Sequence, residues 1–404
     1  MVKEVILRNA HIISPADNLD EILDINIEDG VIVDIAKNIP DNGAQCIDLS
    51  DKVIVPGLVD MHCHLREPGF EYKETIKTGV ESALNGGFVA VCPMANTNPV
   101  ADNVETIKFE VEKAAAIGGV NVFSIAAVTK GLEGKELVDF KALKQAGAVA
   151  FSDDGKPFWN WELFEEALNS GELIISHADD EAFEVEKEIE ILKNVGGKLH
   201  FAHISTKVAI DLIRQAKKDG LNVTCETAPH YFTFTKEDET QKEPFNGRFK
   251  MNPPLGSKED LQAVIKGLQD GTIDCIATDH APHSMEEKTK PFAQSPFGIV
   301  GFETALSASL KLVYDEHLTL NQFVEKMSVN PAKILNLKTH GQVKIGQLAN
   351  LTIIDTDIIY TIRADEFKTK CKITPFEGLE YRGKTSAVII NGKMYTNKQY
   401  ITSS

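Results

Sequence analysis

The stretch GLVDMHCHLREPGF, residues 57–70, decides the fold because it is an apolar run that turns polar at its end. Its first half predicts a buried strand, and His62 and His64 close that strand with one residue between them. Side chains at positions i and i+2 of a strand point the same way, so both imidazoles can reach one common point. A pair of hydrogen-bonded core histidines would give the same pattern. Features elsewhere in the chain are needed to distinguish this structural pair from a metal site.

From residue 53 onward, an apolar run, a polar break and an amphipathic helix follow one another repeatedly. The eight predicted strands are VIVPGLVDMHCH (53–64), GGFVAVCPM (86–94), NVFSIAAV (121–128), AVAFSDD (148–154), ELIISH (172–177), KLHFAHIS (198–205), LNVTCETAPH (221–230) and TIDCIATDH (272–280). Near-continuous apolar strands are typical of a parallel sheet covered by helices. Eight strand–helix units in series favour an α/β fold of the (β/α)8 TIM-like barrel type. An open doubly wound sheet uses the same alternation.

Start signals accompany the predicted helices. Ser257 and Asp260 form a capping box before one apolar stripe, and Asp102 with Glu105 has the same spacing before another. Both pairs predict that a helix begins there.

The two ends of the chain do not follow this repeat. The segments EVILRNAHIIS (4–14) and AVIINGKMY (387–395) predict strands, and Asn391-Gly392 is a hairpin signal. We therefore expect residues 1–52 and 341–404 to pair into one small β-sandwich domain, beside a barrel domain that spans residues 53–340.

The composition restricts the classes of function. The chain has 404 residues, 43% of them hydrophobic, and a net charge of −18, which disfavours nucleic acid and anionic membranes as partners. The six cysteines have no paired spacing, which favours reduced thiols. The N-terminus has no apolar signal region, and no segment has the length of a membrane span. These features predict a soluble cytoplasmic protein.

The polar residues of the predicted strands gather at their C-terminal ends. Besides the two histidines of the first strand, these residues are Asp153, Asp154, His177, His203, Asp279 and His280. Barrel enzymes build their active sites at this face, and structural needs alone give no reason for such a distribution. Four histidines and two carboxylates suit two metal ions, which activate water and polarise a carbonyl. The pattern predicts metal-assisted hydrolysis of an amide or ester. No G-x-S-x-G elbow or G-x-G-x-x-G loop indicates another chemistry.

Several motifs resemble those of the amidohydrolase superfamily and, within it, the bacterial type I dihydroorotases. They are HLREPG (64–69), FSDDG (151–155), AHIST (202–206), KMNPPL (250–255), IATDHAPH (276–283) and GQVKIGQLANLTIID (341–355). The resemblance covers essentially the whole chain. It implies a zinc-dependent enzyme that interconverts N-carbamoyl-L-aspartate and L-dihydroorotate in pyrimidine biosynthesis. We expect two zinc ions per chain, or one tight and one weaker site.

The resemblance also implies individual roles. His62 and His64 would bind the first zinc ion, and His177 and His203 the second. Asp154 rather than Asp153 matches the bridging ligand, which is a carboxylated lysine in many relatives. Asp279 would bind the first zinc ion and act as general acid/base. The implied substrate-binding residues are His64, Arg66, Asn96, Asn252, His283, Phe297 and Gly298.

The sequence departs from the family pattern at two places. Ala95 replaces a usual proline, and the span from His177 to His203 is short, although it still holds one predicted helix. Two alternatives remain open: a hydantoinase, dihydropyrimidinase or allantoinase, and an inactive scaffold that binds aspartate transcarbamoylase. A homodimer and an association with that transcarbamoylase are the expected partnerships.

Overall fold

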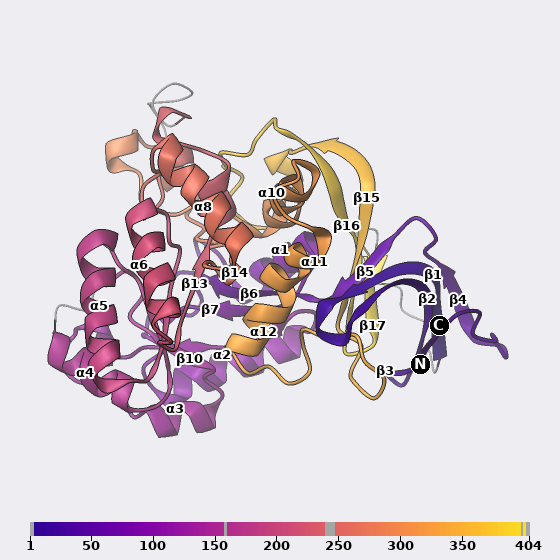
Figure 1. The fold of residues 1–404 in the computed structure, drawn as a ribbon, viewed down its shortest axis with the longest axis horizontal. Coiled ribbons are helices and arrows are strands. Elements are labelled where there is room, and N and C mark those ends of the chain that lie inside the picture. Colours follow the sequence, from indigo (N-terminus) through magenta and orange to yellow (C-terminus); the bar gives the residue numbers. More distant parts are fainter. Residues whose placement is uncertain (1–3, 157–159, 239–246, 397–398, 401–404) are drawn as a thin grey trace.

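Parallel strands close into a barrel in the larger part of the molecule (Figure 1). The computed structural model describes residues 4–156, 160–238, 247–396 and 399–400. Within them, the barrel strands are β6 (Leu58–Cys63), β7 (Phe88–Pro93), β8 (Asn121–Val122), β9 (Ile125–Ala126), β10 (Ala150–Ser152), β11 (Leu173–Ser176), β12 (Lys198–Phe201), β13 (Val223–Thr227) and β14 (Cys275–Ile276). They form two parallel sheets, β6-β7-β8 and β9-β10-β11-β12-β13-β14. A parallel bridge between Cys63 and His280 joins the two ends. This confirms the predicted (β/α)8 barrel and excludes an open sheet.

The third barrel strand differs from its prediction. The run predicted as one strand is two short pieces, of which β8 pairs with β7 and β9 pairs with β10. Ser124 lies between the pieces and donates its hydroxyl to the buried carboxylate of Glu110. Together, β8 and β9 occupy one of the eight strand positions.

Helices surround the barrel. They are α1 (Ile76–Gly86), α2 (Val104–Ile117), α3 (Phe140–Ala146), α4 (Trp161–Asn169), α5 (Glu181–Val195), α6 (Lys207–Lys218), α8 (Lys258–Asp270), α9 (Met285–Lys288), α10 (Phe302–Tyr314), α11 (Leu320–Val324) and α12 (Asn330–Ile334). Ser257 and Asp260 form the predicted capping box of α8. The predicted start of α2 was wrong by one residue: Asn103 caps the helix, because the Asp102 carboxylate accepts from Gly131 N instead. None of the described helices combines the length and apolar composition that a bilayer crossing requires.

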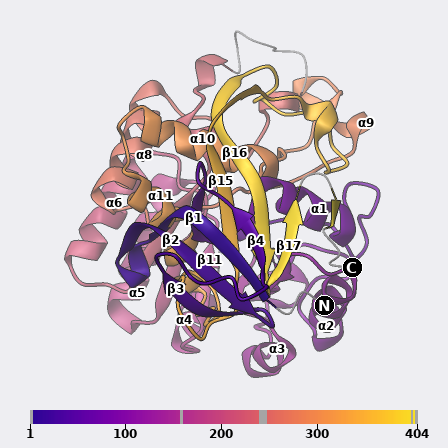
Figure 2. The same ribbon diagram turned by 90° about the vertical axis from the view of Figure 1, so that its right-hand side faces the viewer.

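The terminal segments meet in one sheet beside the barrel (Figure 2). Its strands are β1 (Glu4–Ser14), β2 (Leu19–Glu28), β3 (Val31–Ala36), β4 (Gln45–Asp48), β5 (Val53–Pro56), β15 (Leu351–Thr361), β16 (Glu380–Ile390), β17 (Lys393–Thr396) and β18 (Gln399–Tyr400). β5 lies at its centre, parallel to β1 and antiparallel to β15. An apolar core that includes Leu7, Ile54 and Ile353 supports this sheet, and it is distinct from the larger core of the barrel.

The chain passes from this sheet to the barrel at Gly57. The predicted strand of residues 53–64 was wrong as a single element, since β5 belongs to the terminal sheet and β6 to the barrel. A Cβ at Gly57 would lie 2.3 Å from the Val89 side chain, so only glycine allows this close approach. The predicted domain boundaries at residues 52/53 and 340/341 therefore assign β5 to the barrel domain. In the structure β5 pairs with strands of the terminal sheet.

Candidate active site

The two histidines that end β6 meet a carboxylate from the end of β14. Asp279 Oδ1 lies 3.4 Å from His62 Nε2 and 3.3 Å from His64 Nε2. All three side chains are buried, and their possible ligand atoms lie within 4.8 Å of one another. The i and i+2 spacing therefore does bring both imidazoles to one point, as the alternating geometry of a strand predicts.

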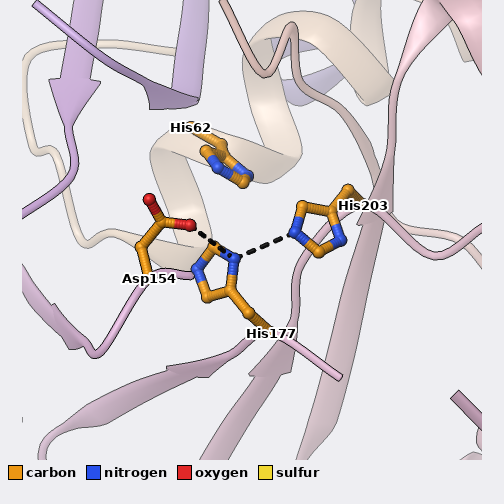
Figure 3. Close-up of side chains that lie close together, drawn as sticks. All are labelled: His62, Asp154, His177 and His203. Atoms are coloured by element: carbon orange, nitrogen blue, oxygen red, sulfur yellow. Dashed lines mark hydrogen bonds and ion pairs between the residues drawn. The ribbon is translucent and has the colours of Figure 1, made fainter. Parts of the chain in front are cut away.

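A second group shares His62 with the first (Figure 3). It adds Asp154, His177 and His203, which follow β10, β11 and β12. His177 Nδ1 lies 2.9 Å from Asp154 Oδ1 and 2.9 Å from His203 Nε2. All six residues predicted as metal ligands thus converge at the C-terminal end of the barrel, where parallel strands direct their last side chains inward.

This set of side chains fits divalent metal ions. His62 Nε2 and His177 Nε2 are buried and have no hydrogen-bond partner among the described residues. Imidazole nitrogens and carboxylate oxygens are the donors that zinc and similar ions bind. His203 and Asp279 adopt positive φ angles of 38° and 45°, an unfavourable conformation that clusters at functional sites. The two groups therefore have the composition and the orphaned nitrogens of a metal centre.

The electrostatics favour a cation at the centre. Burial would raise the pKa of Asp279, but His62 and His64 outweigh it and hold that pKa well below its ordinary value. Burial would lower the pKa of His62, but Asp279 and Glu226 raise it to about 10. The carboxylates therefore stabilise positive charge in this buried site, and a metal ion supplies such charge.

Glu226 is a functional candidate that the sequence analysis missed. It lies in β13, it is fully buried, and its Oε1 accepts a hydrogen bond from His62 Nδ1 at 2.7 Å. This contact leaves Nε2 of His62 facing the centre, which is how a supporting carboxylate orients a metal-binding histidine. The available signal was a carboxylate inside the apolar run of residues 221–230.

The neighbouring aspartates point to different places. Asp153 Oδ1 accepts from the backbone N–H groups of Val128 and Thr129 at 2.8 and 3.0 Å, whereas Asp154 belongs to the second metal group. Successive residues of a strand face opposite sides, so one register cannot direct both carboxylates to the centre.

We expect Asp154→Ala to lose bound metal and Asp153→Ala to keep it. The second variant should instead lower the free energy of unfolding by about 2–4 kcal/mol, because buried N–H donors lose their acceptor. Elemental analysis and thermal unfolding of both variants measure these effects. Loss of metal from Asp153→Ala alone would contradict the assignment.

A cavity of about 260 Å³ opens beside the two metal groups. It is lined by every residue predicted to bind substrate: His64, Arg66, Asn96, Asn252, His283, Phe297 and Gly298. The structure therefore brings all of these positions to one cavity, although they come from five separate loops and strand ends.

Arg66 is poised in this cavity without an acidic partner. Its Nε donates to Pro282 O at 3.1 Å, and it forms no ion pair with any carboxylate of the described residues. The nearest acid in sequence, Glu67, instead binds Lys113 and the backbone N–H of Ile76. A pairing of Arg66 with Glu67, the simplest structural explanation of this arginine, is therefore wrong.

Other lining residues support one another. Asn96 accepts from His64 Nδ1 at 3.0 Å and donates to Asp154 Oδ2, so it links both metal groups. His283 Nε2 donates to Phe297 O at 2.7 Å, and Asn252 Nδ2 donates to Asp179 Oδ1 at 2.8 Å. These contacts fix the side chains in orientations suited to a small polar ligand.

Comparison with known proteins identifies the family of this chain. Residues 53–395 match the model of the amidohydrolase family. The chain is 41% identical to a dihydroorotase of Acetivibrio thermocellus, over 98% of this chain and 100% of that protein. It is also 41% identical to a dihydroorotase of Desulforapulum autotrophicum, over 97% of this chain and 99% of that protein.

Solved structures with the same fold include a hydantoinase and a dihydropyrimidinase. An L-hydantoinase from Arthrobacter aurescens matches with a TM-score of 0.88 and 24% identity, over 99% of this chain and 97% of that one. A dihydropyrimidinase from Brevibacillus agri matches with a TM-score of 0.83 and 19% identity, over 98% of this chain and 96% of that one. From its barrel, its histidine and aspartate groups and these full-length relatives, the chain belongs to the amidohydrolase family, among the dihydroorotases.

Proposed function

We propose that the protein is a dihydroorotase that catalyses the reversible cyclisation of N-carbamoyl-L-aspartate to L-dihydroorotate in pyrimidine biosynthesis. The observation that carries this proposal is the position of Arg66, whose guanidinium lines the cavity beside the metal groups and has no acidic partner among the described residues. Both forms of the substrate carry a carboxylate, and the planar guanidinium suits both of its oxygens. Full-length relatives with this name support the same activity.

We propose zinc as the metal, with two ions per chain. His62, His64 and Asp279 would hold the first ion, His177 and His203 the second, and Asp154 would bridge them. Ions bound there would supply Lewis-acid chemistry, because they lower the pKa of water and polarise the ring carbonyl. Because His62 belongs to both groups, the two proposed ion sites would lie next to each other.

Asp279 would carry the proton in this reaction. Its low pKa keeps the carboxylate ionised at neutral pH, so an oxygen is available to accept a proton from the attacking water. Hydrolysis then requires that proton to reach the departing ring nitrogen. Ring closure follows the reverse route.

The remaining cavity residues would hold the substrate. Arg66 would bind the carboxylate, and Asn96, Asn252 and His283 offer amide and imidazole groups to the polar atoms of the ring. His283 Nε2 is engaged by Phe297 O, and its Nδ1, which lies 3.7 Å from Glu287 Oε2, has no hydrogen-bond partner among the described residues. The backbone at Phe297 and Gly298 would complete this wall.

A hydantoinase-type activity is the second candidate, favoured by the similarity in fold to the L-hydantoinase. Such enzymes resemble this chain but generally have a lysine bridge, where this sequence has Asp154, and their substrates need no arginine for a carboxylate. The inactive-scaffold alternative requires lost ligands, whereas each expected ligand position is filled. The homodimer, the association with aspartate transcarbamoylase and the cytoplasmic location stay predictions.

One assay tests the proposed function. The purified protein should hydrolyse L-dihydroorotate in preference to dihydrouracil and hydantoin, lose activity on prolonged chelation and recover it when zinc is added. Elemental analysis should find two zinc ions per chain after reconstitution. A preference for hydantoin would favour the second candidate, and activity untouched by chelation would refute the metal centre.

A further inference from the structure

A buried lysine lies behind the cavity wall. Lys288 ends the short helix α9, which Ser284 caps directly after His283, and its side chain is almost fully buried at 1% exposure. Its Nζ donates to three backbone carbonyl oxygens: Lys250 at 3.2 Å, Pro296 at 3.2 Å and Gly298 at 2.7 Å. No carboxylate of the described residues lies within ion-pair distance of it.

Burying an ammonium group costs free energy unless each of its N–H donors has an acceptor. Burial lowers the pKa of Lys288 to about 8, so the amine still carries its proton at neutral pH. An ammonium group has three N–H donors, and here each has one carbonyl acceptor. The three backbone carbonyl dipoles are therefore the hydrogen-bond partners of the charge, and the positions of those carbonyls are fixed in return.

The three carbonyls belong to the two segments that form one wall of the cavity. Phe297 lies between two of them, and Asn252 follows Lys250 by two residues; both line the cavity. Gly298 N donates to Lys250 O at 3.0 Å, which joins the two segments directly. At Gly298 a Cβ would lie 2.6 Å from Ala281 O, so the wall packs closely against the loop after Asp279.

The hydrogen bond from Lys288 to Pro296 O also affects the direction of the next backbone N–H, that of Phe297. The C=O and N–H of one trans peptide point in opposite directions, so a Pro296 carbonyl held by Lys288 turns the N–H of Phe297 away from the ammonium group. Among the described residues, Phe297 N–H meets no acceptor. A nearby cation also polarises the peptide and makes this N–H a stronger donor.

We propose that Lys288 is a positioning residue, which holds the peptide between Pro296 and Phe297 so that Phe297 N–H donates to an oxygen of the substrate. The inference rests on the proposed function and assigns Lys288 to substrate binding rather than to the chemical step. It is expected to act on KM, since the metal groups and Asp279 do not contact it.

The test is Lys288→Met, which keeps the apolar stem and removes the charge and the three donors. KM for dihydroorotate should rise about tenfold, the loss expected for one charge-assisted hydrogen bond, with kcat and zinc content changed less than about twofold. Lys326→Met is the matched control. Lys326 is also buried and donates to a backbone carbonyl, Ile273 O at 2.5 Å, but it lies near the start of β14, at the other end of the barrel.

Both variants should lose thermal stability, but only Lys288→Met should raise KM. An unchanged KM in Lys288→Met, or an equal rise in both variants, would overturn the inference. If Lys288→Met does not fold, Lys288→Gln keeps an amide group with two N–H donors and should give a smaller rise in KM. An unchanged KM in that variant would overturn the inference as well. A wild-type protein without dihydroorotase activity would instead refute the proposed function.

Discussion

Replacing Asp279 with alanine is expected to lower kcat for dihydroorotate by a factor of about 10²–10⁴ while the protein stays folded. Asp279 lies between His62 and His64, within 3.4 Å of both, so the variant removes a metal ligand and the proton carrier together. Steady-state kinetics and thermal unfolding of the same preparation measure the two effects. A variant that retains more than about a tenth of the wild-type rate would contradict the general acid/base role.

Asp279→Asn separates the two functions of this side chain. The amide keeps one oxygen for a metal ion but cannot accept a proton at neutral pH. We expect this variant to retain most of its zinc and still fail to turn over. Zinc loss equal to that of the alanine variant would mean that Asp279 acts mainly as a ligand.

Replacing Arg66 with methionine should lower kcat/KM for dihydroorotate at least tenfold. Methionine keeps much of the apolar stem and removes the charge, and truncation of one partner of a buried charge pair costs roughly 2–5 kcal/mol. Uncharged dihydrouracil, to the extent that it is turned over, should be little affected, because it has no carboxylate to lose contact with.

Arg214→Met is the control for this variant. Arg214 pairs with Asp211 and Asp270 on the outer helices, and its replacement should leave both substrates unaffected. If Arg66→Met harms both substrates equally, Arg66 supports the cavity without binding the carboxylate. The substrate would then have to be reassigned toward the hydantoinase candidate.

The sequence predicts the metal centre well because its geometry follows from the barrel. Once His177 and His203 end neighbouring parallel strands, their side chains must emerge at one face. Alternation along a strand allows only one of Asp153 and Asp154 to face the centre, and the family resemblance selected Asp154. Arg66 lies beyond the end of β6 with a φ of 63°, so its position does not follow from alternation. The face of the barrel at which strand-end residues lie can therefore be predicted from the sequence without knowledge of any contact.

Features that depend on contacts between distant segments cannot be predicted from the sequence pattern in this way. Glu226 supports His62 only because closure of the barrel brings β13 near β6, with β14 between them, and an isolated strand pattern gives no such distance. The break at Gly57 reflects the Val89 side chain on the next strand. Lys288 lies in a short polar segment, where a buried ammonium cannot be told from an exposed one.

The position of β5 between β1 and β15 has a consequence for the order in which the chain is completed during synthesis. Lys52 and Asp355, which pair beside these strands, are 303 residues apart. A ribosome therefore releases β1 to β5 long before their partner exists, and one edge of β5 carries unpaired backbone groups throughout that time. The terminal sheet can close only after the barrel segments have emerged, so a nascent chain that stalls within the barrel keeps an aggregation-prone edge for chaperones to cover.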